Sequence, residues 1–233
     1  MPHPSDPIRP APDRPPFTVR EARRADTPAF MAVIDLANPH HPDPFGMARA
    51  VLASPAELPL SHHRDLCLLA EDENGNVVGA LLGGPPRWLF EHAGIDTRAL
   101  ADRLLARLGM IHAVAVHPEH RRAGIGRTLI RHAEERFTRA GYGLVTLNHD
   151  PNHDEFYRGL GYTVDDQLLV HLPDRRLIGV TTDDTRMSSK PLRTPVRLAD
   201  VPGAPSRIIT GLLPGATLPP RAKFDRTRQR LRY

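Results

Sequence analysis

The segment from His117 to Arg127 carries the residue types of an anion-binding turn. It contains the pattern Arg-x-x-Gly-x-Gly at residues 121–126, between an apolar segment at 110–116 and an amphipathic segment after it. We expect a buried strand before the turn and a helix after it. Glycines let backbone amides approach an anion closely, and a helix N-terminus adds unpaired N–H groups and a positive dipole end. The turn therefore predicts a cradle for a pyrophosphate group.

The flanking sequence predicts the elements that position this turn. Residues 66–71 and 77–82 are apolar and flank Asn74-Gly75, which indicates an antiparallel hairpin. Helical periodicity begins at a Thr97 cap, and begins again after the glycine turn, where it ends at Gly141. Further elements are expected downstream, namely a strand at 144–147, a short helix at 154–160, a strand at 162–172 and an edge strand at 185–192. Strands thus alternate with helices, as in an α/β fold.

Composition limits the domain organisation. The chain has 233 residues, 40% of them hydrophobic, which suffices for one good core and is short for two. Prolines crowd both ends, so we expect a disordered leader at 1–16, one domain at 17–192 and an extension at 193–233. The single cysteine, Cys67, excludes an intramolecular disulfide and indicates a reducing compartment. Because the chain has neither an apolar signal core nor an apolar window of about 18 residues, we expect a cytoplasmic protein with no membrane partner.

In this order the elements resemble the GNAT superfamily of acyl-coenzyme A-dependent N-acyltransferases. The resemblance rests on the glycine turn together with a second motif, Phe-Tyr-x-x-Leu-Gly-Tyr at residues 156–162. Residues 17–36 look like the family's opening strand and helix, and residues 66–82 look like its antiparallel pair. The resemblance implies a mixed, mostly antiparallel central sheet with flanking helices, in which a central pair of parallel strands splays apart.

The resemblance also implies a site for acetyl-coenzyme A. By position, the main chain at the end of the central strand would pair with the pantetheine arm, and the amides of the turn would bind the pyrophosphate. Where the family commonly has an asparagine that contacts the pantetheine, this chain has Asp150, with an asparagine two positions away on either side. The residues expected to bind the coenzyme are Val114, Ala115, Val116, Arg121, Arg122, Ala123, Gly124, Ile125, Gly126, Arg127, Asn148 and Asn152.

Two side chains are candidates for proton transfer. The strand that carries His112 is similar to the histidine-bearing strand of arylalkylamine N-acetyltransferases, and histidine titrates near neutral pH. Strand alternation places His112 on the face of Val114 and Val116, where it is either the general base or a hydrogen-bonded core histidine. The family places a tyrosine at the position of Tyr157, whose phenol suits protonation of the departing thiolate. The alternative for Tyr157 is packing beside Phe156.

No metal site is expected, although the chain has 13 histidines. His149 and His153 flank Pro151, which spoils their presentation on a helix, and no cysteine pair accompanies them. We therefore interpret them as solvated loop histidines.

The C-terminal part of the chain is strongly basic. From Pro173 onward it has 13 Lys and Arg against 5 Asp, a net charge of +8, whereas residues 1–172 have a net charge of −4. Nucleic acid or an acidic partner could bind this run, but a solvated tail, or an arm packed on another subunit of a homodimer, is the favoured interpretation. The apolar residues between Ile208 and Leu218 would let part of it dock on the domain.

The predicted function is transfer of an acetyl group from acetyl-coenzyme A to an amine by direct attack in a ternary complex. A small amine, a protein lysine or N-terminus, and a charged RNA all fit as acceptor. The alternative is a non-catalytic sensor of acyl-coenzyme A, or an interaction module with a basic partner-binding tail. Tyr157 together with the full glycine turn argues against that alternative.

Overall fold

The computed structural model describes residues 16–40, 42–54, 60, 64–86, 89, 94–181, 184–228 and 230–233. A seven-stranded sheet, in the order β1-β2-β3-β4-β5-β9-β6, forms its centre. Its strands are β1 (Phe17–Glu21), β2 (Leu66–Asp72), β3 (Val77–Gly84), β4 (Leu108–Val116), β5 (Leu144–His149), β6 (Thr163–Asp165) and β9 (Arg186–Pro191). β4 and β5 run parallel, and the remaining neighbours are antiparallel. The expected mixed, mostly antiparallel sheet is confirmed.

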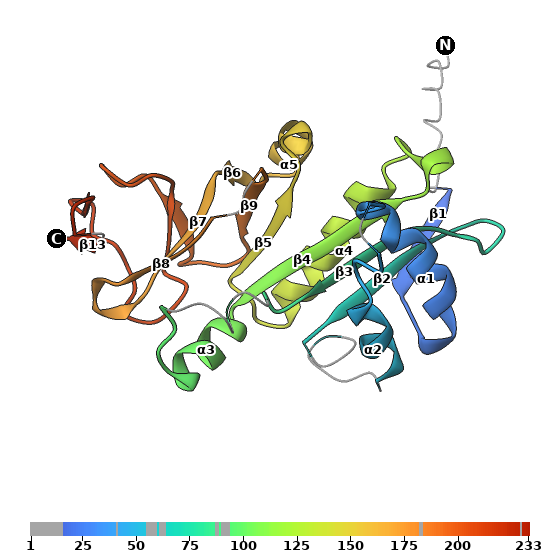
Figure 1. The fold of residues 1–233 in the computed structure, drawn as a ribbon, viewed down its shortest axis with the longest axis horizontal. Coiled ribbons are helices and arrows are strands. Elements are labelled where there is room, and N and C mark those ends of the chain that lie inside the picture. The colour runs from blue at the N-terminus through green and yellow to red at the C-terminus, as the bar shows by residue number, and fades with distance from the viewer. Residues whose placement is uncertain are drawn as a thin grey trace, which may run out of the picture.

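Helices cover both faces of this sheet (Figure 1). Alternation along β2 divides its side chains, because Leu68 and Ala70 pack in one core with Leu129, whereas Leu69 packs in another with Phe30. Burial of a large apolar side chain such as Phe30 contributes about 1.5–3 kcal/mol. The helices are α1 (Thr27–Ile34), α2 (Met47–Ala53), α3 (Arg98–Leu105), α4 (Ile125–Arg139) and α5 (Asp154–Arg158), with short 3-10 helices η1 (Arg24–Asp26), η2 (Asp35–Ala37), η4 (Pro118–His120), η5 (Pro151–His153) and η6 (Pro173–Arg175).

The parallel pair separates along its length. β4 pairs with β5 from Leu108 to Ile111, but β4 continues to Val116. Beside this point β3 pairs with both Ile111 and Ala113, so His112 is the extra residue of a β-bulge. A bulge bends its strand and increases the local twist. The splayed central pair is thereby confirmed, with the separation beginning after Ile111.

A second sheet lies at the end of the molecule that carries the C-terminus, and β1 and α1 lie at the other end (Figure 1). Its order is β10-β11-β7-β8, and β11 is parallel to β7. A separate hairpin of β12 and β13 follows. These elements are β7 (Gln167–His171), β8 (Leu177–Thr181), β10 (Arg197–Ala199), β11 (Ile208–Thr210), β12 (Lys223–Asp225) and β13 (Arg230–Arg232).

Two strand predictions were wrong. The strand expected at 162–172 is divided between β6 and β7, because β6 pairs with β9 in the first sheet whereas β7 pairs with β8 and β11 in the second. The strand expected at the sheet edge is β9, which lies inside the sheet between β5 and β6. Pro191 does not prevent this because it is the last residue of β9.

The C-terminal extension folds against the rest of the chain in its described part. Ile209, Leu212 and Leu213 share a core with Leu168 and Val170 of β7. The expected docking of the apolar residues between Ile208 and Leu218 is therefore confirmed, whereas a solvated tail is wrong for this segment, because the second sheet removes these residues from water. β11 also pairs with β7 across the expected boundary at residue 192. The expected leader lies outside the described residues, apart from Pro16.

Two further expectations concern Cys67 and membrane segments. Cys67 is buried in β2, and burial raises the pKa of its thiol to about 12, which keeps the thiol protonated and unreactive. Among the described residues, the helices are all too short or too polar to span a bilayer.

Candidate functional site

The glycine turn leaves backbone amides open at the start of α4. Gly124 is the N-cap of α4 and adopts a left-handed conformation with φ of +84°, which glycine accepts without a steric penalty. The first α-helical hydrogen bond runs from the amide of Thr128 to the carbonyl of Gly124, and no side chain caps the helix. The three preceding helical amides, those of residues 125–127, have no acceptor one turn back. With residues 121–124 exposed, the turn presents amides and arginines to an approaching anion.

The turn is in contact with the end of β4 and with α5. An added Cβ at Gly126 would lie 3.7 Å from Cγ2 of Val116 and 4.0 Å from Cζ of Phe156, so both side chains border the space beside Gly126. Arg127 Nη1 donates a hydrogen bond of 3.5 Å to the carbonyl of Gly159, just after α5. Both sequence motifs and the central strand are therefore assembled in one place.

The end of β4 offers a backbone edge for a ligand. Beyond Ile111, β4 pairs with β3 on one side but no longer with β5 on the other. Val114 and Val116 are half-buried and pack toward α4, whereas Ala115 is buried on the α1 face. An extended chain with amide groups can add to such an edge as a further strand does.

Tyr157 lies in an aromatic cluster inside this assembly. Its side chain is 7% exposed, and burial raises the pKa of its phenol to about 12. Its ring centroid lies 4.4 Å from that of His149, 5.1 Å from that of Phe156 and 5.8 Å from that of Tyr162. A phenol in this environment stays protonated at neutral pH, so Tyr157 is suited to donate a proton and not to accept one.

The interpretation of His149 as a solvated loop histidine was wrong. His149 is buried on β5 and not solvated, with Nδ1 2.9 Å from the carbonyl oxygen of Asp150 and Nε2 2.8 Å from Ser188 Oγ. A carbonyl oxygen only accepts, so Nδ1 carries the proton and Nε2 accepts from the Ser188 hydroxyl. Burial lowers the pKa of His149. This effect is larger than the opposite effect of the Asp154 carboxylate, whose Oδ1 lies 3.8 Å from Nδ1 of His149. Because side chains alternate along a strand, His149 lies on the same face of β5 as the buried Leu147. This pattern could have predicted the burial of His149.

The bulge changes the surroundings of His112. It interrupts the alternation of β4, since Ile111 packs toward α4 and Ala113 toward α1. His112 is half-buried, and its Nε2 lies 3.4 Å from the point where a Cβ on Gly84 would stand. The Asp65 carboxylate would collide with the same Cβ, so the absence of a side chain at Gly84 leaves room for Asp65 and His112 to approach each other. Asp65 was not expected, because it precedes β2 and is distant in sequence.

The three polar residues near the β5 end have different surroundings. Asp150 is the N-cap of η5, and its carboxylate accepts a hydrogen bond of 2.8 Å from the amide of Asn152. This local cap gives the aspartate a structural role. The side chains of Asn148, on β5, and Asn152, in η5, are exposed.

In the described part of the chain, no three His, Cys, Asp or Glu side chains gather as metal ligands do. His153 is exposed in η5, in contrast to His149. His41, His62 and His63 lie outside the described residues.

Comparison with known proteins identifies relatives of this fold. The model of the acetyltransferase (GNAT) family matches residues 30–162, more than half of the chain. A GNAT-family protein from Desulfovibrio desulfuricans has a TM-score of 0.52 at 14% identity, over 76% of this chain and 99% of its own. The PaiA N-acetyltransferase from Thermoplasma acidophilum, in complex with coenzyme A, has a TM-score of 0.51 at 13% identity, over 75% and 98%. A GNAT acetyltransferase from Elizabethkingia anophelis with acetyl-CoA bound has a TM-score of 0.49 at 15% identity, over 76% and 99%. No curated protein matches the chain in sequence.

Proposed function

Because the chain belongs to the acetyltransferase (GNAT) family, we propose that it transfers an acetyl group from acetyl-coenzyme A to an amine by direct attack. The observation that carries the proposal is the proximity of Gly126 to both Val116 and Phe156, whose side chains border the space that a Cβ at Gly126 would occupy. This proximity puts the open amides of α4 beside the unpaired edge of β4 and next to the helix that carries Tyr157. An anion cradle, a backbone edge and a proton donor are then placed to contact different parts of one extended ligand.

Acetyl-coenzyme A supplies the acetyl group as an activated thioester when it is bound. We assign its pyrophosphate to the glycine turn, where the open helical amides and the lack of a Cβ at Gly124 fit a close anion. Each hydrogen bond from a backbone amide to a charged oxygen contributes about 1.5–3 kcal/mol, so several together support micromolar binding. The edge of β4 at residues 114–116 fits the amides of the pantetheine arm, and the exposed side chains of Asn148 and Asn152 are the candidates for its polar contacts.

Proton transfer is assigned to two groups. An alkyl amine has a pKa of about 10.4, so it must lose a proton before its nitrogen can attack a carbonyl. His112 at the bulge is the proposed base, and the carboxylate of Asp65 on the same side of Gly84 favours the imidazolium that forms. Tyr157 holds the proton for the departing thiolate at Oη, because burial raises its pKa to about 12.

A half-buried carboxylate supports a cationic acceptor. Asp35 lies in η2, which packs against β4. Its Oδ1 is buried, and within the described residues it has no hydrogen-bond partner. Burial, followed by the charge of Asp43, raises the pKa of Asp35. An ammonium group on the acceptor would offset both the burial of Oδ1 and the repulsion from Asp43. We therefore assign Asp35 to binding the amine.

Release of free thiol from acetyl-coenzyme A, measured against a panel of amines, tests the proposed reaction. Tyr157→Phe should lower kcat about tenfold to a hundredfold with little change in the Kd of coenzyme A. Tyr162→Phe is the matched control, since it removes a hydroxyl from the same aromatic cluster and should leave kcat within about twofold. Binding of acetyl-coenzyme A without turnover on any amine would instead establish a sensor, and an unchanged kcat in Tyr157→Phe would remove Tyr157 from the mechanism.

A further inference from the structure

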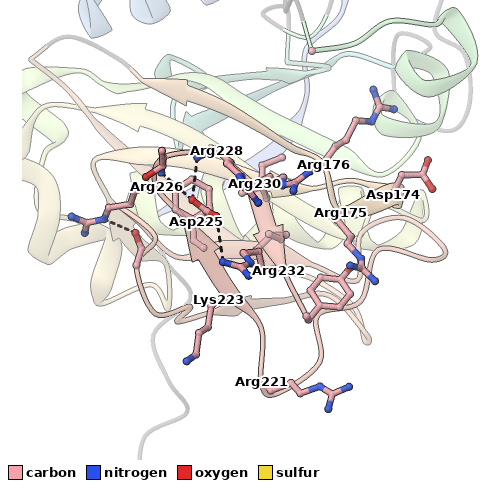
Figure 2. A pocket seen from close by; sticks show the side chains of 17 residues that line it. Asp174, Arg175, Arg176, Arg221, Lys223, Asp225, Arg226, Arg228, Arg230 and Arg232 are labelled. Atoms are coloured by element: carbon pink, nitrogen blue, oxygen red, sulfur yellow. Dashed lines mark hydrogen bonds and ion pairs between the residues drawn. The ribbon is translucent and has the colours of Figure 1, made fainter.

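A basic hollow of about 1440 Å³ opens beside the C-terminus (Figure 2). Figure 2 shows cationic side chains around it from η6, from the segment before β12 and from the β12–β13 hairpin. Eight of the lining residues are Arg or Lys, and two are Asp. None of them belongs to the glycine turn, β4 or α5, so the hollow is separate from the proposed acetyl-transfer site. The proposed acetyl-transfer site therefore does not account for the positive charge of this hollow.

Much of this charge has no internal partner. Arg232 lies 3.6 Å from Asp225, and Arg176 lies 2.8 Å from Asp96. Among the described residues, no carboxylate lies within ion-pair distance of four other exposed cations, namely Arg221, Lys223, Arg228 and Arg230. The Asp225 carboxylate is also engaged, because it accepts hydrogen bonds of 3.1 Å from the amides of Thr227 and Arg228. These four exposed cations are therefore available to an external anion.

The β12–β13 hairpin places two exposed arginines on strand β13. Leu231 is 2% exposed and anchors β13 in a small core with Leu169 and Ile208, whereas its neighbours Arg230 and Arg232 are exposed. Residues two apart on a strand lie roughly 7 Å from each other on the same face. The two arginines therefore extend from one face of a folded strand and do not belong to a solvated tail.

Aromatic rings line the same hollow. The ring of Tyr233, the last residue, has the Arg175 guanidinium 4.7 Å from its centroid and the buried His171 at 6.3 Å, with Tyr233 Oη 3.4 Å from His171 Nε2. These contacts hold the chain end against β7. Tyr233 and Phe224 both line the hollow and are half-buried, so each keeps part of its surface accessible.

We propose that this hollow binds the phosphate backbone of a nucleic acid. Seven of the eight cations are arginines, whose planar guanidinium groups match phosphate oxygens in pairs. The pair of arginines on β13 together with the cations around it suits a ligand with several negative charges, such as a polynucleotide. The accessible aromatic surfaces favour a nucleic acid over an acidic protein segment, because bases stack on such rings.

The test measures binding by fluorescence anisotropy over a range of salt concentrations. The probes are labelled mixed-sequence oligonucleotides, as single-stranded RNA, single-stranded DNA and duplex DNA, with labelled polyglutamate as the acidic-peptide comparison. The Arg228→Gln/Arg230→Gln double variant should weaken nucleic-acid binding about tenfold or more. Loss of two phosphate contacts should also reduce the slope of log K against log salt by about 1.4 for a single strand and about 1.8 for a duplex. The probe with the lowest Kd at a given salt concentration identifies which polynucleotide form is preferred.

The matched control is Arg131→Gln/Arg139→Gln, which removes the same charge from exposed positions on α4. This control should bind nucleic acid within about twofold of the wild type. Equal weakening in both double variants would overturn the proposal, because general charge and not the hollow would then be responsible. Tighter binding of polyglutamate than of every oligonucleotide would also overturn it and assign the hollow to an acidic protein. Acetyl transfer to a small amine should be unchanged in Arg228→Gln/Arg230→Gln, which keeps this result independent of the proposed reaction.

Discussion

Replacement of Gly124 by alanine tests the proposed cradle most directly. Gly124 has φ of +84°, and no atom lies within 4 Å of the position of an added Cβ. The cost to folding is therefore backbone strain without a clash, roughly 1–2 kcal/mol, or a fall in Tm of a few degrees. The new methyl group would stand in the space assigned to the pyrophosphate. Loss of two amide contacts at about 1.5 kcal/mol each raises the Kd of coenzyme A on the order of a hundredfold.

Calorimetric titration with coenzyme A and thermal unfolding separate the two effects. Gly75→Ala is the matched control, because Gly75 has φ of +80°, and an added Cβ there also has open space around it. Gly75 lies in the β2–β3 turn, so its variant should lose similar stability and keep the affinity of the wild type. If Gly124→Ala bound coenzyme A as tightly as Gly75→Ala does, the pyrophosphate could not lie on this turn.

Three other predictions concern ionisable groups that are buried or half-buried. Because the pKa of His149 is lowered in the folded state, the unfolded chain binds a proton first, so the free energy of unfolding should fall as pH drops below about 6.5. Urea unfolding at pH 7 and pH 5 should show a smaller fall for His149→Phe, and an equal fall would contradict the assigned neutral state. Asp35→Asn should raise KM for a cationic amine about tenfold or more with coenzyme A affinity unchanged, measured by initial rates; an unchanged KM would exclude an ion pair with the acceptor. Since the pKa of Tyr157 is about 12, kcat should show no loss from tyrosine ionisation near pH 10, which a pH profile can check against Tyr157→Phe.

Local features were predicted well because they depend on neighbouring residues. The Asn74-Gly75 hairpin is present, with Gly75 at positive φ, and Thr97 caps α3 by accepting a hydrogen bond of 3.2 Å from the amide of Leu100. Gly124 likewise adopts the left-handed conformation at the start of α4. In each case the chemistry of a few consecutive residues selects the backbone conformation.

Contacts between distant segments were predicted poorly. The division of residues 162–172 between two sheets depends on β9 and β11, and no pattern within the segment marks the change. The burial of Ile209 and Leu213 depends on an apolar face provided by β7, which sequence reasoning had placed in one strand with β6. The hollow beside Tyr233 likewise required the folding of the whole basic extension.

The candidate site shows the same division. The sequence alone determined that a central strand, a glycine turn and a tyrosine motif occur in this order, because each is a short pattern with its own local physics. Only the tertiary structure decided that Val116 and Phe156 lie near Gly126, that His149 packs against Tyr157 and that Asp65 lies near the bulge at His112. Those contacts join residues far apart in the chain, and they depend on strand register, on the bulge and on which apolar faces are buried together.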